Sequence, residues 1–300
     1  MLCTYGQLLR DGLAPSGFDA DGKPRYEDPA ASLWLVIATE LYARRANDHE
    51  FVRRALYPAL EQVTERIRAG GPFGLRVDDD ALLVSGEGDQ AMKRADVNAL
   101  WYQAQVAIAQ LAKVLGRKQN GAFYLAWARE HQTRVNESMW DEAGGCLLHA
   151  IGPAGPVRGL EPSQLWAAAL PPPLLPPERA SRLVATIERE LFTPLGLREA
   201  PGAPRIEPEW LGPFISAYLR AHGRDAAAQA RVRAWLDALA HHLATHAAEH
   251  LPVAFELSSD AALDDEPLHY AGDPVSAVAA AELLRAWVEE LDHAGAFAPS

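Results

Sequence analysis

Glu256 is the carboxylate in this 300-residue sequence whose surroundings best suit catalysis. Pro252 ends a long helical pattern, and the apolar run 253–255 then leads to Glu256 just before a polar loop. A carboxylate at the edge of an apolar environment can act as a general base on water. From position alone, a salt-bridged glutamate at the rim of the protein is the commoner arrangement.

Two other clusters contain residue types that bind metal ions. His242, His246 and His250 lie four residues apart, and two imidazoles at this spacing can chelate a divalent cation. They also flank a leucine stripe, which favours half-solvated side chains. The acidic run 78–80 lacks the asparagine and glycine spacing of a calcium loop, so a solvated loop is expected there. We predict no metal site and no cofactor.

The stretch "KRADVNALWYQAQ" (93–105) puts Trp101 and Tyr102 behind an Asp and an Asn, at the predicted start of a long Ala-rich helix. Aromatic side chains in this position can belong to the core or to the wall of a binding site. The sequence has no G-x-S-x-G, no P-loop and no H-E-x-x-H motif, which excludes the common serine hydrolase, nucleotide-binding and zinc protease patterns.

Helices must position these residues, because helical periodicity of the apolar residues dominates the chain. Asp28 and Pro29 suit a helix start, Asp48 and Asp96 suit N-caps, and Pro58 is expected to kink its helix. The predicted helices span residues 2–11, 30–46, 49–71, 96–115, 121–140, 162–170, 176–191, 208–222, 224–251 and 274–292.

The helices fall into pairs, which either stack as a solenoid or close into a ring. The sequence has no internal repeat, so a solenoid is less favoured than an α/α toroid. Strand signals are too few for a sheet-based fold, and residues 73–90 read as a hairpin-like excursion. We predict an all-α, toroid-like single domain over residues 1–300, with short β-hairpin excursions.

The composition narrows the classes of function. The formal net charge is -12, which argues against nucleic acid and anionic membranes as partners. No apolar run is long enough to span a membrane, and the N-terminus does not resemble a secretory signal. The two cysteines, Cys3 and Cys146, give no disulfide framework, so a cytoplasmic location is expected.

Six segments resemble, in the same order, motifs of the amylo-α-1,6-glucosidase domain of glycogen debranching enzymes. "VNALWYQAQ" resembles "EINALWYNAL", "EPSQLWAAALP" resembles "RPNQifAlSLP", and "LFTPLGLRE" resembles "LLTPlGLRtL". "PEWLGPFISAYLRAHG" resembles "WPWLLGPFidAylrv.g", and similar segments begin near Tyr5 and at Phe255. Together they cover about residues 3–291.

The resemblance implies an (α/α)6 toroid that hydrolyses α-1,6-linked glucose with inversion. Inversion needs an acid and a base roughly 6.5–9.5 Å apart. The glutamate of the family's "SEIFDG" motif matches Glu256, which identifies it as the candidate base. The resemblance also implies that Trp34, Asn98, Trp101 and Trp210 contact an α-glucan or maltooligosaccharide.

Several polar positions depart from the family pattern. The block with the family's acid, "LTWMDA", has no counterpart, so Asp89 and Asp96 are only weak candidates for the acid. Ala30, Glu161 and Ser163 replace the family's Asp, Arg and Asn. The family's opening helix pair also has no counterpart. We therefore expect an incomplete toroid with an exposed apolar stripe, and a homodimer or a companion chain to cover it.

Three hypotheses follow for the function. The favoured one is a debranching enzyme-like domain with impaired catalysis and weak α-glucan binding. The first alternative is an active inverting α-1,6-glucosidase that uses Glu256 as base and a substitute acid. The second alternative is a non-catalytic domain for structure or association. The favoured hypothesis places Glu256 at a cavity mouth without a second carboxylate at the inverting distance.

Overall fold

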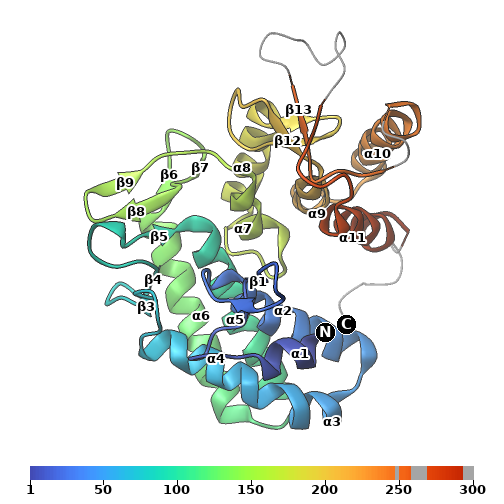
Figure 1. The fold of residues 1–300 in the computed structure, drawn as a ribbon. Helices are drawn as coiled ribbons and strands as arrows, with labels where there is room; N and C mark the ends of the chain where they lie inside the picture. The colour runs from blue at the N-terminus through green and yellow to red at the C-terminus, as the bar shows by residue number, and fades with distance from the viewer. Residues whose placement is uncertain (247–249, 258–268, 293–300) are drawn as a thin grey trace. The chain divides into compact units, whose positions relative to one another are not determined.

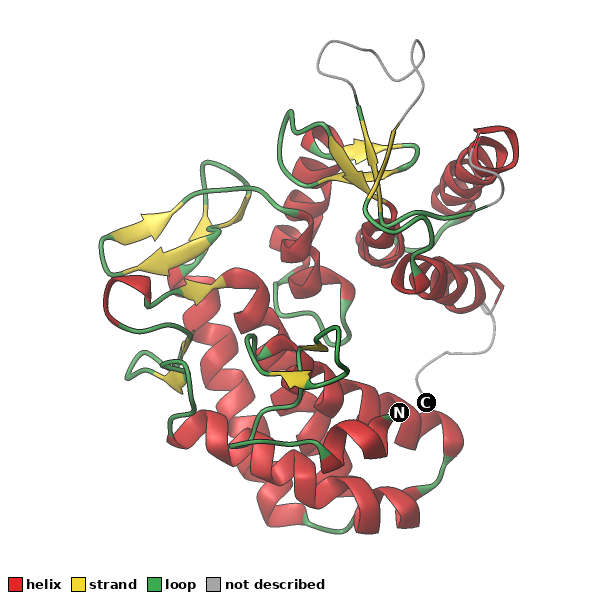
Figure 2. Ribbon diagram, in the orientation of Figure 1, coloured by secondary structure: helices red, strands yellow, loops and turns green. Residues whose placement is uncertain are grey.

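The computed structural model describes residues 1–246, 250–257 and 269–292. Contacts divide the chain into two compact units: residues 1–140 with 148–158 form unit 1, and residues 141–147 with 159–300 form unit 2. Helices occupy 58% of the residues and strands 13%, which confirms the predicted helical class (Figure 2). The predictions of a single domain and of a toroid depend on how the two units are arranged, and they stay predictions.

Unit 1 is built mainly from helices, with short antiparallel strand pairs between them (Figure 1). Its elements are α1 (Leu2–Gln7), β1 (Gly17–Phe18), β2 (Pro24–Arg25), α2 (Ala30–Ala46), α3 (His49–Phe51), the π-helical η1 (Val52–Leu56), α4 (Tyr57–Ala69), β3 (Arg76–Val77), β4 (Leu83–Val84), η2 (Gly88–Gln90), β5 (Lys93–Arg94), α5 (Ala95–Val114), α6 (Lys118–Ser138), β8 (Ala150–Gly152) and β9 (Gly155–Val157). The strands β6 (Trp140–Asp141) and β7 (Cys146–Leu147) lie where the chain passes between the units.

Helix α5 forms the centre of unit 1. It packs against α2 and α6, and 16 of its 20 residues are buried. Alanines at many positions let these neighbouring helices approach closely, while Leu100 and Trp101 fill the remaining space. The aromatic start of this helix is therefore core, since Trp101 is only 1% exposed.

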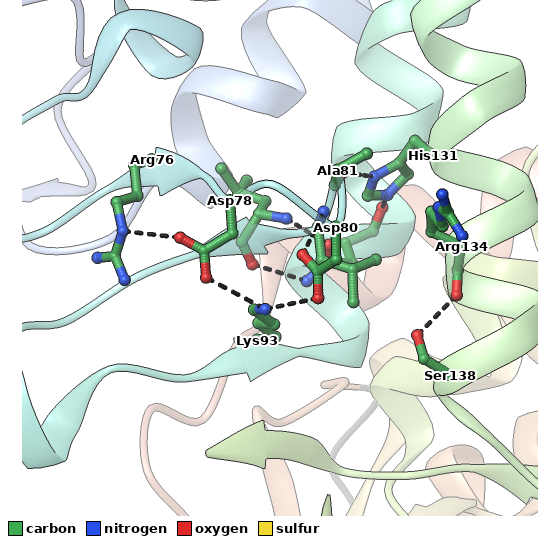
Figure 3. A network of polar contacts seen from close by, with 11 residues as sticks. Arg76, Asp78, Asp80, Ala81, Lys93, His131, Arg134 and Ser138 are labelled. Atoms are coloured by element: carbon green, nitrogen blue, oxygen red, sulfur yellow. Dashed lines mark hydrogen bonds and ion pairs between the residues drawn. The ribbon is translucent and has the colours of Figure 1, made fainter. Parts of the chain in front are cut away.

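Asn98 and His131 hold the excursion of residues 76–84 against α5 and α6. The Asn98 side chain accepts a hydrogen bond from the Leu83 N–H at 2.8 Å and donates to the Leu83 carbonyl at 2.9 Å. The buried His131 ring lies 2.8 Å from the Ala81 carbonyl oxygen and 2.9 Å from that of Asn98 (Figure 3). Burial lowers the pKa of His131, and both carbonyls and Asp80 only partly oppose this.

Helix ends in unit 1 follow the predicted signals with one correction. Asp48 caps its helix as predicted, accepting from the Phe51 N–H at 3.2 Å. Residues 49–69 form one unbroken helical run, and the π-helical turn of residues 52–56 comes directly before Pro58, where a distortion was expected. The prediction of Asp96 as N-cap is wrong: Arg94 is the N-cap, and the Asp96 carboxylate pairs with its guanidinium instead.

Unit 2 combines helices with one larger sheet (Figure 1). Its elements are η3 (Pro162–Leu165), α7 (Trp166–Ala169), α8 (Pro177–Glu190), β10 (Phe192–Thr193), β11 (Gly196–Arg198), β12 (Arg205–Glu207), η4 (Pro208–Trp210), α9 (Leu211–Ala221), α10 (Ala226–His246), β13 (Ala254–Glu256), β14 (His269–Ala271), α11 (Ala277–Ala286) and the π-helical η5 (Trp287–Asp292).

The sheet of unit 2 is antiparallel, in the order β10-β11-β12-β13-β14. The sequence did not predict it. Its buried side includes Ile206 and Phe255, which face each other across β12 and β13. A cluster of aromatic rings, Phe192, Phe214 and Trp235, with centroids 4.8–5.4 Å apart, packs nearby in the core of the unit.

Candidate functional site

A cavity of about 320 Å³ lies in unit 2, where two 3-10 turns begin. Its lining combines three glutamates with a tryptophan: Glu161, Pro162, Ser163, Glu199, Ala200, Glu207 and Trp210. The turn η3 supplies the first group, and the segment from β11 to η4 supplies the rest. Cavities of roughly 300 Å³ are at the small end of ligand pockets.

Trp210 is fixed in this cavity from two sides. Its indole Nε1–H donates to Glu207 Oε2 at 2.9 Å. Its ring lies against that of Trp166, with centroids 5.2 Å apart and an interplanar angle of 55°. A held aromatic ring beside hydrogen-bonding carboxylates presents both a flat apolar face and polar acceptors, which is the combination that a sugar ring requires.

Arg205 contacts two carboxylates, that of Glu199 just after β11 and that of Glu207 in β12. Its Nε donates to Glu207 Oε1 at 3.0 Å, and it lies 4.0 Å from a Glu199 carboxylate oxygen. Both Glu207 oxygens therefore accept hydrogen bonds, which fixes the orientation of this side chain.

The strand register connects Glu256 to this group. Glu256 in β13 is directly opposite Arg205 in β12, so their side chains share one face of the sheet. Glu207, two residues along β12, lies on the same face at the diagonal position, which is about 7–8 Å away between backbone positions. The register thus puts a second carboxylate on the same face as exposed Glu256, while the expectation of no second carboxylate at the inverting distance stays a prediction.

Glu209 is a half-buried carboxyl group in η4, next to Trp210. Burial, together with the negative charges of Glu207 and Glu282, raises the pKa of Glu209, while Arg205 partly opposes the shift. Glu209 and Glu207 were both missed from the sequence. The segment "RIEPEW" could have identified them, because its alternating pattern puts two glutamates at the end of a strand, just before a tryptophan.

The two weak acid candidates lie in unit 1. The Asp96 carboxylate is paired with Arg94, whose Nε donates to Asp96 Oδ1 at 3.1 Å, so it is held by a positive charge. Asp89 is exposed in the turn η2. Neither belongs to the compact unit that contains Glu256.

The candidate sugar-binding residues divide between core and cavity. Trp210 lines the unit 2 cavity. Trp34 is half-buried in α2, while Trp101 and Asn98 are buried in α5. The Asn98 amide is used by the backbone of β4 and by the Arg94 carbonyl oxygen, 2.8 Å from Nδ2, so its geometry indicates a structural role.

A smaller cavity of about 260 Å³ lies in unit 1, beside the N-terminus of α2. Asp28 and Arg94 line it, 3.7 Å apart, together with Phe73. Phe73 is 57% exposed and has a φ of 58°, an unusual conformation for a bulky residue. Glu27 adds a second carboxylate, most of the remaining lining is apolar or backbone, and Asp28 is already paired with the Arg94 guanidinium.

The acidic run of unit 1 contains its own cation. Lys93 Nζ lies 3.1 Å from Asp78 and 2.6 Å from Asp80, and Arg76 contacts Asp78 at 2.9 Å (Figure 3). Burial opposes the charged form of Lys93, but its hydrogen bonds to Asp80 and Asp78 outweigh burial and raise the pKa of Lys93. The ammonium occupies the place where a metal ion would be held.

The described residues contain no group of three or more histidines, cysteines or carboxylates that could hold a metal ion. The His242 ring packs edge-on against Phe255, with centroids 5.5 Å apart. The His246 side chain lies outside the described part of the structure, as does most of the polar loop after Glu256. In the part that is described, no helix is both long and apolar enough to cross a membrane.

The cavity belongs to a mostly helical chain whose family match supports a glycoside hydrolase-like domain. The model of one family, described as amylo-alpha-1,6-glucosidase, matches residues 1–202. Because this match covers more than half of the chain, the protein belongs to the amylo-α-1,6-glucosidase family. No curated protein matches the chain.

Two solved structures show the same kind of fold. A rhamnosidase from Klebsiella oxytoca, with rhamnose bound, is 18% identical with a TM-score of 0.57, and the match covers 93% of this chain and 50% of that one. An uncharacterized conserved protein from Thermus thermophilus is 14% identical with a TM-score of 0.62, covering 96% of this chain and 86% of that one. The chain thus spans half the length of the rhamnosidase.

Proposed function

We propose that this chain is an α-glucan-binding glycoside hydrolase-like domain with impaired turnover. The observation that carries the proposal is the unit 2 cavity, where Trp210 is held by Glu207 and Trp166. Family membership supports a glucose-containing ligand. The cavity is small and offers few neutral hydrogen-bonding side chains, so affinity for maltooligosaccharides is expected to be weak.

Turnover is impaired because the residues that hold and protonate the sugar in the family are replaced. Glu161 and Ser163 line the cavity in place of the family's Arg and Asn. Poor positioning costs catalysis several kcal/mol, and the family's acid block, where a well-placed acid contributes roughly 10²–10⁴-fold in rate, has no counterpart in this chain. The alternative, an active inverting glucosidase, is supported by the register that places Glu256 and Glu207 on one face.

Glucose release from phosphorylase-limit dextrin tests the proposal. We expect slow release that requires micromolar protein over hours, and a further loss in Glu256→Gln, because the amide cannot accept a proton from water. Binding of the dextrin should persist in both proteins. Rapid release that Glu256→Gln abolishes would establish the active glucosidase instead, while absence of dextrin binding would refute the proposed function itself.

A role in association is the second candidate, and the exposed face of α11 favours it. Ala277, Ala281 and Leu284 follow helical spacing, continue to Val288, and are all exposed, with Leu284 at 65%. A contiguous exposed apolar face commonly marks an association surface. Light scattering at tens of micromolar should show a dimer that Leu284→Glu dissociates. A monomer at that concentration would contradict this candidate.

A further inference from the structure

Glu209 is placed beside the residues that bind the ligand in the proposed function. It lies in η4 between Glu207 and Trp210, both of which line the unit 2 cavity. Its side chain is half-buried, unlike that of exposed Glu256. The Glu209 carboxyl group is not itself part of the cavity lining, but it lies near enough to the Glu207 carboxylate, which is, to feel its charge.

The charges around Glu209 are fixed by other residues. Glu207 accepts hydrogen bonds from Arg205 and Trp210. Glu282 in α11 accepts two from Arg285, at 2.8 and 2.9 Å. Both neighbouring carboxylates are therefore already engaged by donors on other residues. Among the described residues, no hydrogen bond or ion pair to the Glu209 carboxylate occurs.

Gly212 explains why α11 comes so close to this carboxyl group. A Cβ atom at Gly212 would lie only 2.7 Å from the Glu282 backbone oxygen, so only glycine lets α11 pack against the start of α9. This packing brings the Glu282 charge toward η4 and removes water from it. Two fixed negative charges and partial burial together disfavour ionisation of Glu209.

We propose that Glu209 is the proton donor for glycoside cleavage in this protein, in place of the family's missing acid. The proposal rests on the proposed function. Acid–base cleavage of a glycoside needs one protonated carboxyl group as the acid and one ionised carboxylate as the base. Glu209 has this environment, while Asp96 is paired with an arginine and Asp89 is exposed.

The step balances with water as the only co-reactant. Glu209 gives its proton to the glycosidic oxygen as the bond from that oxygen to the anomeric carbon breaks. A water oxygen bonds to the anomeric carbon from the opposite face, and Glu256 takes the proton that this water loses. Each product gains a hydroxyl group, the configuration inverts, and proton exchange with solvent restores both glutamates.

The leaving group provides the test, because fluoride departs without protonation whereas a sugar hydroxyl does not. For Glu209→Gln we expect hydrolysis of an α-1,6-linked glucoside to fall about 100-fold or more, and hydrolysis of α-glucosyl fluoride to stay within about threefold of wild type. Glu256→Gln should lose both activities. Glu178→Gln, at an exposed position in α8, is the matched control and should keep both.

A carbon-13 titration of the glutamate carboxyls, with Glu209→Gln to assign the signal, measures the protonated state directly. We expect Glu209 to titrate above the ordinary glutamate range, and hydrolysis of the glucoside to fall as pH rises through that midpoint. An ordinary midpoint, equal losses on both substrates, or no hydrolysis of either by wild type would overturn the assignment. Retained dextrin binding in these cases would leave the proposed function standing.

Discussion

Replacing Asn98 with leucine is expected to lower the free energy of unfolding of unit 1 by about 3–5 kcal/mol. Asn98 is fully buried, and its amide satisfies the N–H and the carbonyl of Leu83 as well as the Arg94 carbonyl. Leucine has a similar size but leaves these backbone groups without a partner, at about 1–3 kcal/mol for each buried group. Urea unfolding followed by tryptophan fluorescence measures the change.

Gln105→Met provides the matched control on the same helix. Gln105 is also buried, yet its Oε1 has no hydrogen-bond partner among the described residues. Removing an amide oxygen that is already unsatisfied should change the unfolding free energy by less than about 1 kcal/mol. If Asn98→Leu were as mild as Gln105→Met, the assignment of Asn98 to a structural role would fail.

Truncating Trp210 to alanine is expected to weaken maltooligosaccharide binding about 30-fold, which corresponds to roughly 2 kcal/mol. The ring is held in place before the ligand arrives, by Glu207 and by Trp166, so little side-chain entropy is lost on binding. Trp210→Phe should give an intermediate loss, because it keeps a ring but not the indole hydrogen bond. Isothermal titration calorimetry measures both.

The control is Trp127→Ala in unit 1. Trp127 also has an interaction partner, since the Arg68 guanidinium lies 3.3 Å from its ring centroid, but it does not line the unit 2 cavity. Its removal should leave the dissociation constant within about twofold. Equal losses in Trp127→Ala and Trp210→Ala would indicate that the ligand does not bind in the unit 2 cavity.

Local signals in the sequence predicted the helices well, because capping and periodicity act over neighbouring residues. Asp48 caps its helix, and Gly70 with a φ of 97° ends α4 where glycines were expected to end it. The sheet of unit 2 was not predictable, since its strands have two or three residues each. Their pairing joins residues 205–207 to 254–256, a distance in sequence that no local pattern reveals.

In the candidate site, too, local motifs were predictable and long-range contacts were not. Trp210 was identified through its motif and lies in the cavity. Asn98 belongs to a motif as well, but residue type cannot distinguish an amide that binds a ligand from one that satisfies a buried strand. Glu209 was missed because its character depends on Glu282, which only the packing of α9 against α11 brings near.

The near-complete burial of α5 has a consequence for how this protein can diverge. A helix packed by alanines on several faces tolerates neither larger side chains nor polar ones, so new ligand preferences cannot arise there without loss of the fold. The cavity of unit 2, in contrast, is formed by the short turns η3 and η4 and by the segment around Glu199. Substitution at their exposed or half-buried positions, such as Glu199 and Ser163, needs no repacking of a core, and these are the positions where different sugar preferences can arise while the frame is kept.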